Sequence, residues 1–338
     1  MNFLKLPLAA LALALALALA ACGDGGAKPA AKTLKIAVIP KGTSSPYWNI
    51  VHAGAVKAQQ ELQASQPLEI LYRGSVKESE SAQAIAVVEE MINQQVDAIV
   101  LAPNDADALA RIVDRAASKK IPVIIIDSAV KTDSYSSFVA TDNKKGGAMG
   151  GEELAKRLGN KGKVIMLRYQ AGSASTNERE EGAIAALKAH PDIQLVDTSK
   201  YGGDTDSDTQ KSAENLLAAY KNADGSLTID GIFCPNLTTT FGMLKALQTT
   251  KSAGQIKFVG FDSSEALVTA MKAGQIDALV VQDPINMGYL GVKTAVDVIN
   301  GKSVPRAVDT GVHLITRETM DSPESREILD PPASKYLK

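Results

Sequence analysis

Short apolar runs rich in valine and isoleucine alternate with longer amphipathic stretches along most of the chain. The predicted strands are residues 34–39, 68–72, 98–101, 123–126, 138–140, 163–167, 194–198, 231–233, 257–259, 278–281 and 312–315. The predicted helices are residues 47–63, 79–94, 105–118, 146–158, 175–189, 208–220, 238–248, 265–273 and 286–300. Short apolar strands alternating with helices form parallel sheets with crossover helices on both faces. The pattern therefore predicts an α/β fold.

The strands are too numerous for one comfortable sheet, and the pattern restarts near Thr141. We therefore expect two Rossmann-like parallel sheets, each in its own lobe. Ligands of such sheets bind beyond the carboxyl ends of the strands. The residues that directly follow each strand are therefore the candidates for a functional site.

Polar side chains recur at these positions. Each one has a common structural explanation as a turn or helix cap, and taken singly that explanation is the more frequent one. Capping alone does not explain why polar residues recur after so many of the predicted strands. The candidates are Asp127, Asn143, Asn177, Arg179, Asn236, Asp262 and Gln282.

Two aromatic residues, Tyr47 and Trp48, begin the first predicted helix, in a chain with 4% aromatic residues and one tryptophan. They form either a stacking platform for a ligand or a helix entry packed on the core, with Pro46 in its first turn. Asp, Asn, Gln and Arg side chains beside aromatic faces suit a polyhydroxylated ring, because they hydrogen-bond hydroxyls while the aromatics cover C–H groups.

The first residues resemble an export signal. Lys5 precedes an uncharged run over residues 6–21, which is shorter than the roughly 20 residues that span a bilayer. Cys22 follows Leu-Ala-Ala directly, as in the lipobox of bacterial lipoproteins. We expect residues 1–21 to be a removed signal peptide, Cys22 to be lipidated and anchored in the bilayer, and residues 22–32 to be a flexible tether.

Composition and residue counts argue against several other functions. With a net charge of −2, the chain lacks the excess of basic residues that is typical of a nucleic-acid binder. With Cys22 modified, Cys234 has no partner for a disulfide or a cysteine metal site. His52, His190 and His313 are not spaced as metal ligands, and no Gly-x-Ser-x-Gly nucleophile motif is present. We therefore expect no catalytic residues, no metal and no cofactor.

The chain resembles the ribose/galactose type of periplasmic sugar-binding protein over residues 33 to about 316. The segments that carry this resemblance are residues 35–39 with Pro46-Tyr47-Trp48, VDAIVLAP (96–103), IPVIIID (121–127), ATDNKKGG (140–147), GSASTNEREEG (172–182), VGFD (259–262) and 278–288. Regulators of the lac-repressor type share this fold, but the export signal stands where their DNA-binding region would be.

The resemblance implies two lobes joined by a three-crossing hinge that closes on ligand. It implies an N-terminal lobe of residues 33–142 and 283–308, and a C-terminal lobe of residues 143–282 and 309–338. The ligand-binding positions it implies are Tyr47, Trp48, Asp127, Asp142, Asn143, Asn177, Asn236, Asp262 and Gln282, with Arg179 near Asn177.

Three departures from the ribose pattern indicate altered specificity. Ser128 and Asn177 stand where ribose binders carry arginine, and Leu237 stands where an acidic residue is common. Lys41, Arg168 and Tyr201 are candidate replacements for the missing groups.

The expected function is capture of a small sugar or polyol for an ABC importer. The expected partners are the permease, its ATPase and the lipid bilayer, and the expected location is the periplasmic or cell-surface side of a membrane. We expect a monomer that binds no nucleic acid. A lipoprotein that reports a sugar or signal molecule to a receptor has the same sequence features, so it remains an alternative.

Overall fold

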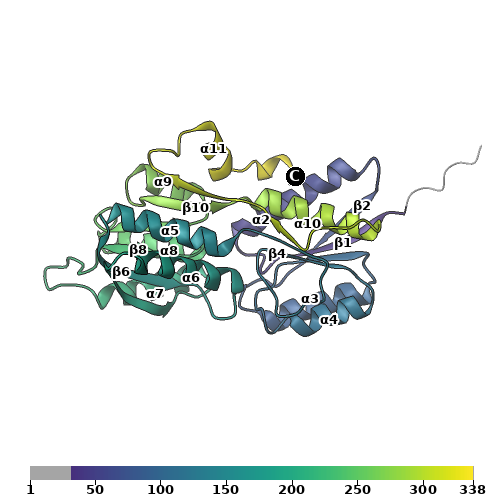
Figure 1. Ribbon diagram of the computed structural model, residues 1–338, viewed down its shortest axis with the longest axis horizontal. Coiled ribbons are helices and arrows are strands. Elements are labelled where there is room, and N and C mark those ends of the chain that lie inside the picture. The colour runs from purple at the N-terminus through teal and green to yellow at the C-terminus, as the bar shows by residue number, and fades with distance from the viewer. Residues whose placement is uncertain (1–31, 338) are drawn as a thin grey trace, which may run out of the picture. The chain divides into compact units, whose positions relative to one another are not determined.

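The computed structural model describes residues 32–337. Within them, the first sheet contains β1 (Leu34–Ile39), β2 (Leu68–Tyr72), β3 (Ala98–Leu101), β4 (Val123–Ile126), β5 (Ser137–Ala140) and β11 (Ala307–Asp309), in the order β11-β5-β4-β3-β1-β2. All neighbouring strands in this sheet are parallel. The helices packed on it are α2 (Pro46–Leu62), α3 (Ser81–Asn93), α4 (Ala110–Ser118) and α10 (Pro284–Ile299). We call this sheet and its helices the first lobe (Figure 1).

The second sheet contains β6 (Lys161–Arg168), β7 (Asp192–Tyr201), β8 (Gly231–Phe233), β9 (Lys257–Phe261), β10 (Ala278–Gln282) and β12 (Val312–Thr316), in the order β12-β10-β9-β8-β6-β7. The pairing of β12 with β10 is antiparallel, and the other pairings are parallel. Its helices are α5 (Asn143–Arg157), α6 (Ala174–Lys188), α7 (Asp206–Ala218), α8 (Leu237–Thr249), α9 (Glu265–Lys272) and α11 (Pro323–Leu329). We call this sheet and its helices the second lobe.

Each sheet is buried on both faces, and strand alternation divides its side chains between two helix layers. In β1, Ile36 and Val38 pack in the cluster with α2 and α10, whereas Ala37 and Ile39 pack in the cluster with α3 and α4. The second sheet is divided in the same way between α5 with α6 on one face and α7, α8, α9 and α11 on the other. This two-sided burial explains why the strands are continuous apolar runs in the sequence.

Close backbone contact joins α2 to α10 across the first lobe, and Figure 1 shows the two helices side by side. A Cβ atom added at Gly54 would lie 2.0 Å from the Ile285 carbonyl oxygen, and one added at Gly288 would lie 2.0 Å from that of Val51. Both positions therefore require glycine because a side chain would push the two helices apart.

The chain passes between the sheets three times. It leaves the first sheet after β5, returns to it between β10 and β11, and leaves again between β11 and β12. The predicted fold class, two α/β lobes with parallel sheets, is thus confirmed. None of the helices between residues 32 and 337 combines the length and apolar character that a membrane span requires.

The sequence pattern missed β11 and α11, and it began one helix too early. β11 has three residues with alternate exposure and pairs with β5, so it has no apolar run to detect. In α11, Leu329 is the buried residue. The helix predicted from residue 105 begins at Ala110, because the Asp105 carboxylate accepts hydrogen bonds from the amides of Asp107 and Ala108 and stabilises a turn instead. Residues 1–31, with the predicted signal peptide, Cys22 and most of the tether, lie outside the described residues.

Candidate ligand-binding site

Two aspartates, one from each lobe, directly follow strands and point into the same region. Asp127 follows β4 with φ 63°, and Asp262 follows β9 with φ 65°. In each case the amide N–H donates to a neighbouring segment, Val139 O for Asp127 and Val280 O for Asp262. A left-handed backbone at a non-glycine residue costs about 1–3 kcal/mol and is concentrated at functional sites. Both side chains are buried, as are most groups around them.

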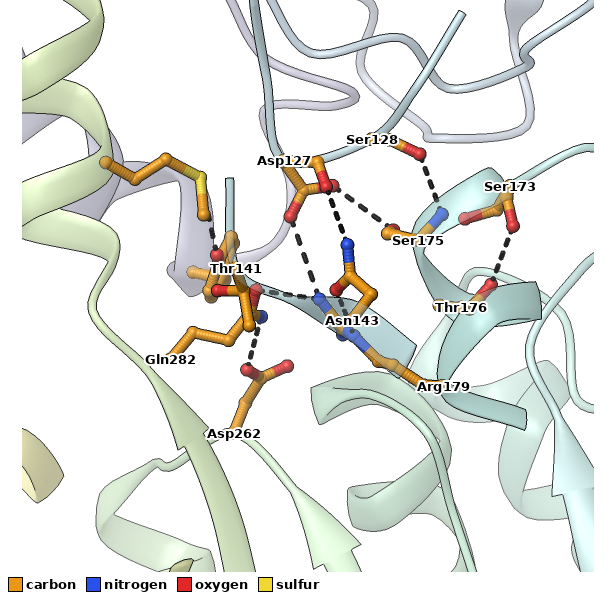
Figure 2. A network of polar contacts seen from close by, with 12 residues as sticks. Asp127, Ser128, Thr141, Asn143, Ser173, Ser175, Thr176, Arg179, Asp262 and Gln282 are labelled. Atoms are coloured by element: carbon orange, nitrogen blue, oxygen red, sulfur yellow. Dashed lines mark hydrogen bonds and ion pairs between the residues drawn. The ribbon is translucent and has the colours of Figure 1, made fainter. Parts of the chain in front are cut away.

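Arg179, on the first turns of α6, connects the polar groups of the second lobe (Figure 2). Its Nε donates to Asn143 Oδ1 (2.9 Å), its Nη1 to the Pro235 carbonyl (3.1 Å) and its Nη2 to Gln282 Oε1 (2.7 Å). The guanidinium carbon lies 4.2 Å from the ring centroid of Phe261. Four strand ends or helix starts are therefore held around one buried cation.

Gln282 links Arg179 to the second aspartate. Its Nε2 donates to Asp262 Oδ1 (2.8 Å), and the other carboxylate oxygen accepts from the Leu237 amide (3.0 Å) at the start of α8. Burial raises the pKa of Asp262, and the charge of Arg179 and the Gln282 hydrogen bond oppose that shift. The hydrogen bonds from Gln282 and the Leu237 amide fix the Asp262 carboxylate in place at the end of β9.

Lys41 holds the aspartate of the first lobe. Its Nζ lies 2.7 Å from Asp127 Oδ2, and it donates to Ser175 Oγ (2.9 Å) and Ser173 Oγ (3.3 Å) of the second lobe. Ser128 Oγ accepts from the Ser175 amide (3.0 Å) at the N-terminus of α6 (Figure 2). Arg179 Nη2 reaches to 3.9 Å of Asp127 Oδ1. The two lobes are therefore linked by charged and hydroxyl groups.

An aromatic and acidic wall completes the site. The rings of Tyr47 and Trp48 meet edge to face with centroids 5.1 Å apart, and Trp48 Nε1 donates to Glu78 Oε1 (2.8 Å). Both rings are buried and pack against the first-lobe core while also lining the cavity described next. The two alternatives for this pair are thus compatible. Burial raises the pKa of Tyr47 strongly and also raises that of Glu78.

These groups line a small, partly open cavity. The space open to the centres of water molecules is about 30 Å³, which exceeds the roughly 10–15 Å³ that one water needs. Its lining residues come from both lobes and are Lys41, Ser45, Tyr47, Trp48, Glu78, Asp127, Tyr169, Ser175, Thr176, Arg179, Asn236, Leu237, Thr238, Asp262 and Gln282. Within residues 32–337, no cluster of His, Cys, Asp and Glu could hold a metal ion. The cavity is suited to a small polar molecule.

The structure brings most of the predicted site residues together. Tyr47, Trp48, Asp127, Arg179, Asn236, Asp262 and Gln282 line the cavity. Asn143 lies behind it and donates from Nδ2 to the Asp127 carbonyl (3.2 Å), while Asp142 caps α5 through the Lys145 amide (3.0 Å). Asn143 thus supports Asp127 from outside the cavity lining, whereas Asp142 stabilises the start of α5.

Asn177 is outside the lining, because the helical twist of α6 turns Arg179 toward the cavity instead. Arg179, predicted as a binding residue near Asn177, therefore supplies an arginine to the second-lobe half of the site. Of the three candidate replacements, Lys41 lines the cavity. Arg168 pairs with Glu180 (2.6 Å) and lies over the Tyr201 ring, and both Arg168 and Tyr201 are outside the lining.

Sequence reasoning did not select several lining residues, chiefly Glu78, Tyr169, Ser175 and Thr238. Tyr169 directly follows β6, so its position after a strand was a detectable signal. Glu78 lies in an irregular segment between β2 and α3, where no periodic pattern marks it. Its burial is set by the approach of Trp48 from α2.

The two lobes, three crossings and a polar cavity at the strand ends define a two-lobed α/β binding protein. Residues 36–303 match the family described as periplasmic binding protein domain. The chain belongs to this family. It is therefore a binding protein and not an enzyme.

Known proteins with similar sequences and structures are sugar-transport binding proteins. A carbohydrate transporter solute-binding protein from Agrobacterium radiobacter, solved with D-arabinose, has 32% identity and a TM-score of 0.82, covering 88% of this chain and 99% of that one. One from Agrobacterium vitis with bound D-fucose has 34% identity and a TM-score of 0.81, covering 88% and 100%. The ribose import binding protein of Haemophilus influenzae is 29% identical over 292 residues, which are 85% of this chain and 92% of that protein.

Proposed function

We propose that this chain is the solute-binding component of an ABC importer and captures a neutral monosaccharide or polyol between its lobes. The observation that carries the proposal is the small cavity in which buried Asp, Arg, Gln and Asn side chains from both lobes converge beside Tyr47 and Trp48. Carboxylates accept from ring hydroxyls, and Arg and amide N–H groups donate to them. The relatives solved with D-arabinose and D-fucose support the same ligand class.

Each lobe contributes a preorganised half of the site. In the second lobe, Arg179, Gln282 and Asp262 are already hydrogen-bonded to one another. Asn236 caps α8 because its side-chain Oδ1 accepts from the backbone N–H of Thr239. Its side-chain Nδ2 is therefore the group that can donate to a ligand. In the first lobe, Lys41 fixes Asp127. A preorganised site loses little conformational entropy when the ligand binds.

Binding and closure are coupled because the site is divided between the lobes. A ligand held by Asp127 of the first lobe and Asp262 of the second makes both sets of hydrogen bonds in the closed arrangement alone. It therefore shifts the equilibrium toward closure in proportion to that difference in affinity. The closed form is the form that a permease recognises, and no chemistry on the ligand is required.

We propose that residues 1–21 are removed, that Cys22 carries the lipid, and that the protein acts as an anchored monomer beside a permease and its ATPase. The proposed lobe boundaries are residues 33–142 with 283–308, and 143–282 with 309–338. Mass spectrometry of the N-terminal peptide tests the lipid, since a diacylglycerol-modified Cys22 is expected and an unmodified Cys22 contradicts it.

The function can be tested with the only tryptophan in the sequence, Trp48. The full-length chain in detergent is titrated with D-arabinose, D-ribose, D-fucose, D-allose, xylitol and myo-inositol, following tryptophan fluorescence and thermal melting. Binding to the folded state raises the melting temperature by mass action. We expect a saturable change in both signals with at least one compound. No response in either signal across the panel contradicts the proposed ligand class.

A further inference from the structure

Tyr169 places a buried hydroxyl in the cavity wall that makes no hydrogen bond of normal distance and angle within the described part of the chain. The residue is 1% exposed and directly follows β6. Its backbone is fixed on both sides, because the amide donates to Glu180 Oε1 (3.2 Å) and the carbonyl accepts from the Gly203 amide (3.1 Å). The hydroxyl itself makes no hydrogen bond of good geometry with any group among residues 32–337.

A buried hydroxyl in this state is costly. Leaving a buried polar group unsatisfied destabilises a protein by about 1–3 kcal/mol, so such groups are rare and require an explanation. Two partly buried tyrosines elsewhere in the chain are satisfied: Tyr72 OH donates to the Trp48 carbonyl (3.1 Å), and Tyr220 OH donates to the Val196 carbonyl (3.2 Å). Tyr169 differs from them in lining the cavity, which indicates that its partner is a molecule bound there.

Glu78 faces the same part of the cavity from the other lobe. It is 8% exposed and also lines the cavity. One of its oxygens accepts the Trp48 indole N–H (2.8 Å). Burial, the charge of Glu78 and a side-chain interaction with Glu78 raise the pKa of Tyr169, so the Glu78 carboxylate lies beside the hydroxyl without forming a well-aligned hydrogen bond to it. A carboxylate acceptor and a phenol donor thus stand together, one from each lobe.

We propose that Tyr169 and Glu78 form a subsite for one hydroxyl group of the ligand, in which Tyr169 donates to the hydroxyl oxygen and the hydroxyl proton is donated to Glu78. The inference rests on the proposed function and deepens it, because it specifies the ligand class. A carboxylate at this position repels anions, so the subsite selects a neutral sugar or polyol with a free hydroxyl here and disfavours sugar acids and sugar phosphates. Since the two residues belong to different lobes, the subsite is complete in the closed arrangement.

Tyr169→Phe tests the subsite because it removes the hydroxyl and keeps the ring. The full-length wild type, Tyr169→Phe and Tyr220→Phe are titrated by calorimetry with the six compounds named above, and each is melted without ligand. We expect Tyr169→Phe to melt at or above the wild-type temperature and to bind about 10- to 100-fold more weakly. The matched control Tyr220→Phe, whose hydroxyl is satisfied and outside the cavity, should bind with wild-type affinity and melt slightly lower.

A second variant and a set of analogues make the test independent of one substitution. Glu78→Gln keeps an acceptor for Trp48 but removes the negative charge, and it too should weaken binding of the neutral compound. Among monodeoxy analogues of that compound, the one lacking the contacted hydroxyl should bind equally to the wild type and Tyr169→Phe.

The outcomes separate the two proposals. If the wild type binds a compound of the panel and both variants bind it within about twofold of the wild type, the subsite is refuted while the proposed function stands. If the wild type binds none of the compounds, the proposed function fails and the subsite fails with it. A Tyr169→Phe variant that melts well below the wild type also refutes the subsite, because the hydroxyl would then have a partner in the unliganded protein.

Discussion

Arg179→Met should destabilise the folded protein more than any substitution at an exposed arginine. Arg179 is 2% exposed and makes three hydrogen bonds, to Asn143, Pro235 and Gln282. Methionine keeps the apolar stem beside Phe261 but leaves those three acceptors without their donor. The substitution therefore removes the one side chain that hydrogen-bonds to Asn143, Pro235 and Gln282 together.

The expected magnitude follows from these contacts. Each buried acceptor left unsatisfied costs about 1–3 kcal/mol, and part of this is recovered where side chains such as Gln282 reorient. Removing one partner of a buried ion pair typically costs about 3–5 kcal/mol. We expect Arg179→Met to lower the free energy of unfolding by about 3–5 kcal/mol and to weaken sugar binding, because Gln282 and Asp262 lose their alignment.

Urea unfolding followed by circular dichroism measures the change. The matched control is Arg115→Met, since Arg115 pairs with Glu89 at the surface with side chains 48% and 38% exposed. An exposed pair contributes at most about 1 kcal/mol, so the control should unfold close to the wild type. If Arg179→Met loses no more stability than Arg115→Met, the assignment of Arg179 as the organiser of the second-lobe site is wrong.

Three further substitutions test other parts of the structure. Lys41→Met removes the partner that holds Asp127 in place. The loss of a charged hydrogen bond, about 1.5–3 kcal/mol, should weaken the binding of D-arabinose or D-ribose about 10- to 100-fold when measured by calorimetry. An unchanged affinity would contradict the role of Lys41 in positioning Asp127. Burial raises the pKa of Glu78 above its ordinary 4.5, so the folded chain holds more protons than the unfolded chain between the two values and stability falls as pH rises through that window. Glu78→Gln should therefore weaken the fall of melting temperature with rising pH, measured in thermal melts from about pH 4 to about pH 8. Part of the pH dependence should remain, because burial raises the pKa of Asp262 as well. An unaltered pH dependence would exclude Glu78 as one of its sources. Gly288→Ala should lower stability by about 1–3 kcal/mol or more because its methyl group would meet the α2 backbone, and an unchanged melting temperature would show that α10 can move.

The alternation of apolar strands and amphipathic helices was enough to predict two parallel-sheet lobes. Strands buried on both faces have no polar side, so they are continuous apolar runs that mark themselves in the sequence. The position of Asp127 and Asp262 after such runs was equally informative, because parallel strands end at one edge of a sheet. Short peripheral elements such as β11 and α11 lack this signal.

The tertiary structure alone decided which polar residues converge. Asn177 and Arg179 are two positions apart on α6, and the direction of that helix determines which of them enters the cavity. Lys41 and Ser175 are distant in sequence and meet because the lobes approach each other. Glu78 acquires its place from Trp48, and the unsatisfied hydroxyl of Tyr169 exists only where burial excludes water. The local sequence pattern determines whether a segment forms a strand or a helix. The burial of a side chain and its hydrogen-bond partners depend on segments far away in the sequence, and they determine the chemistry of the site.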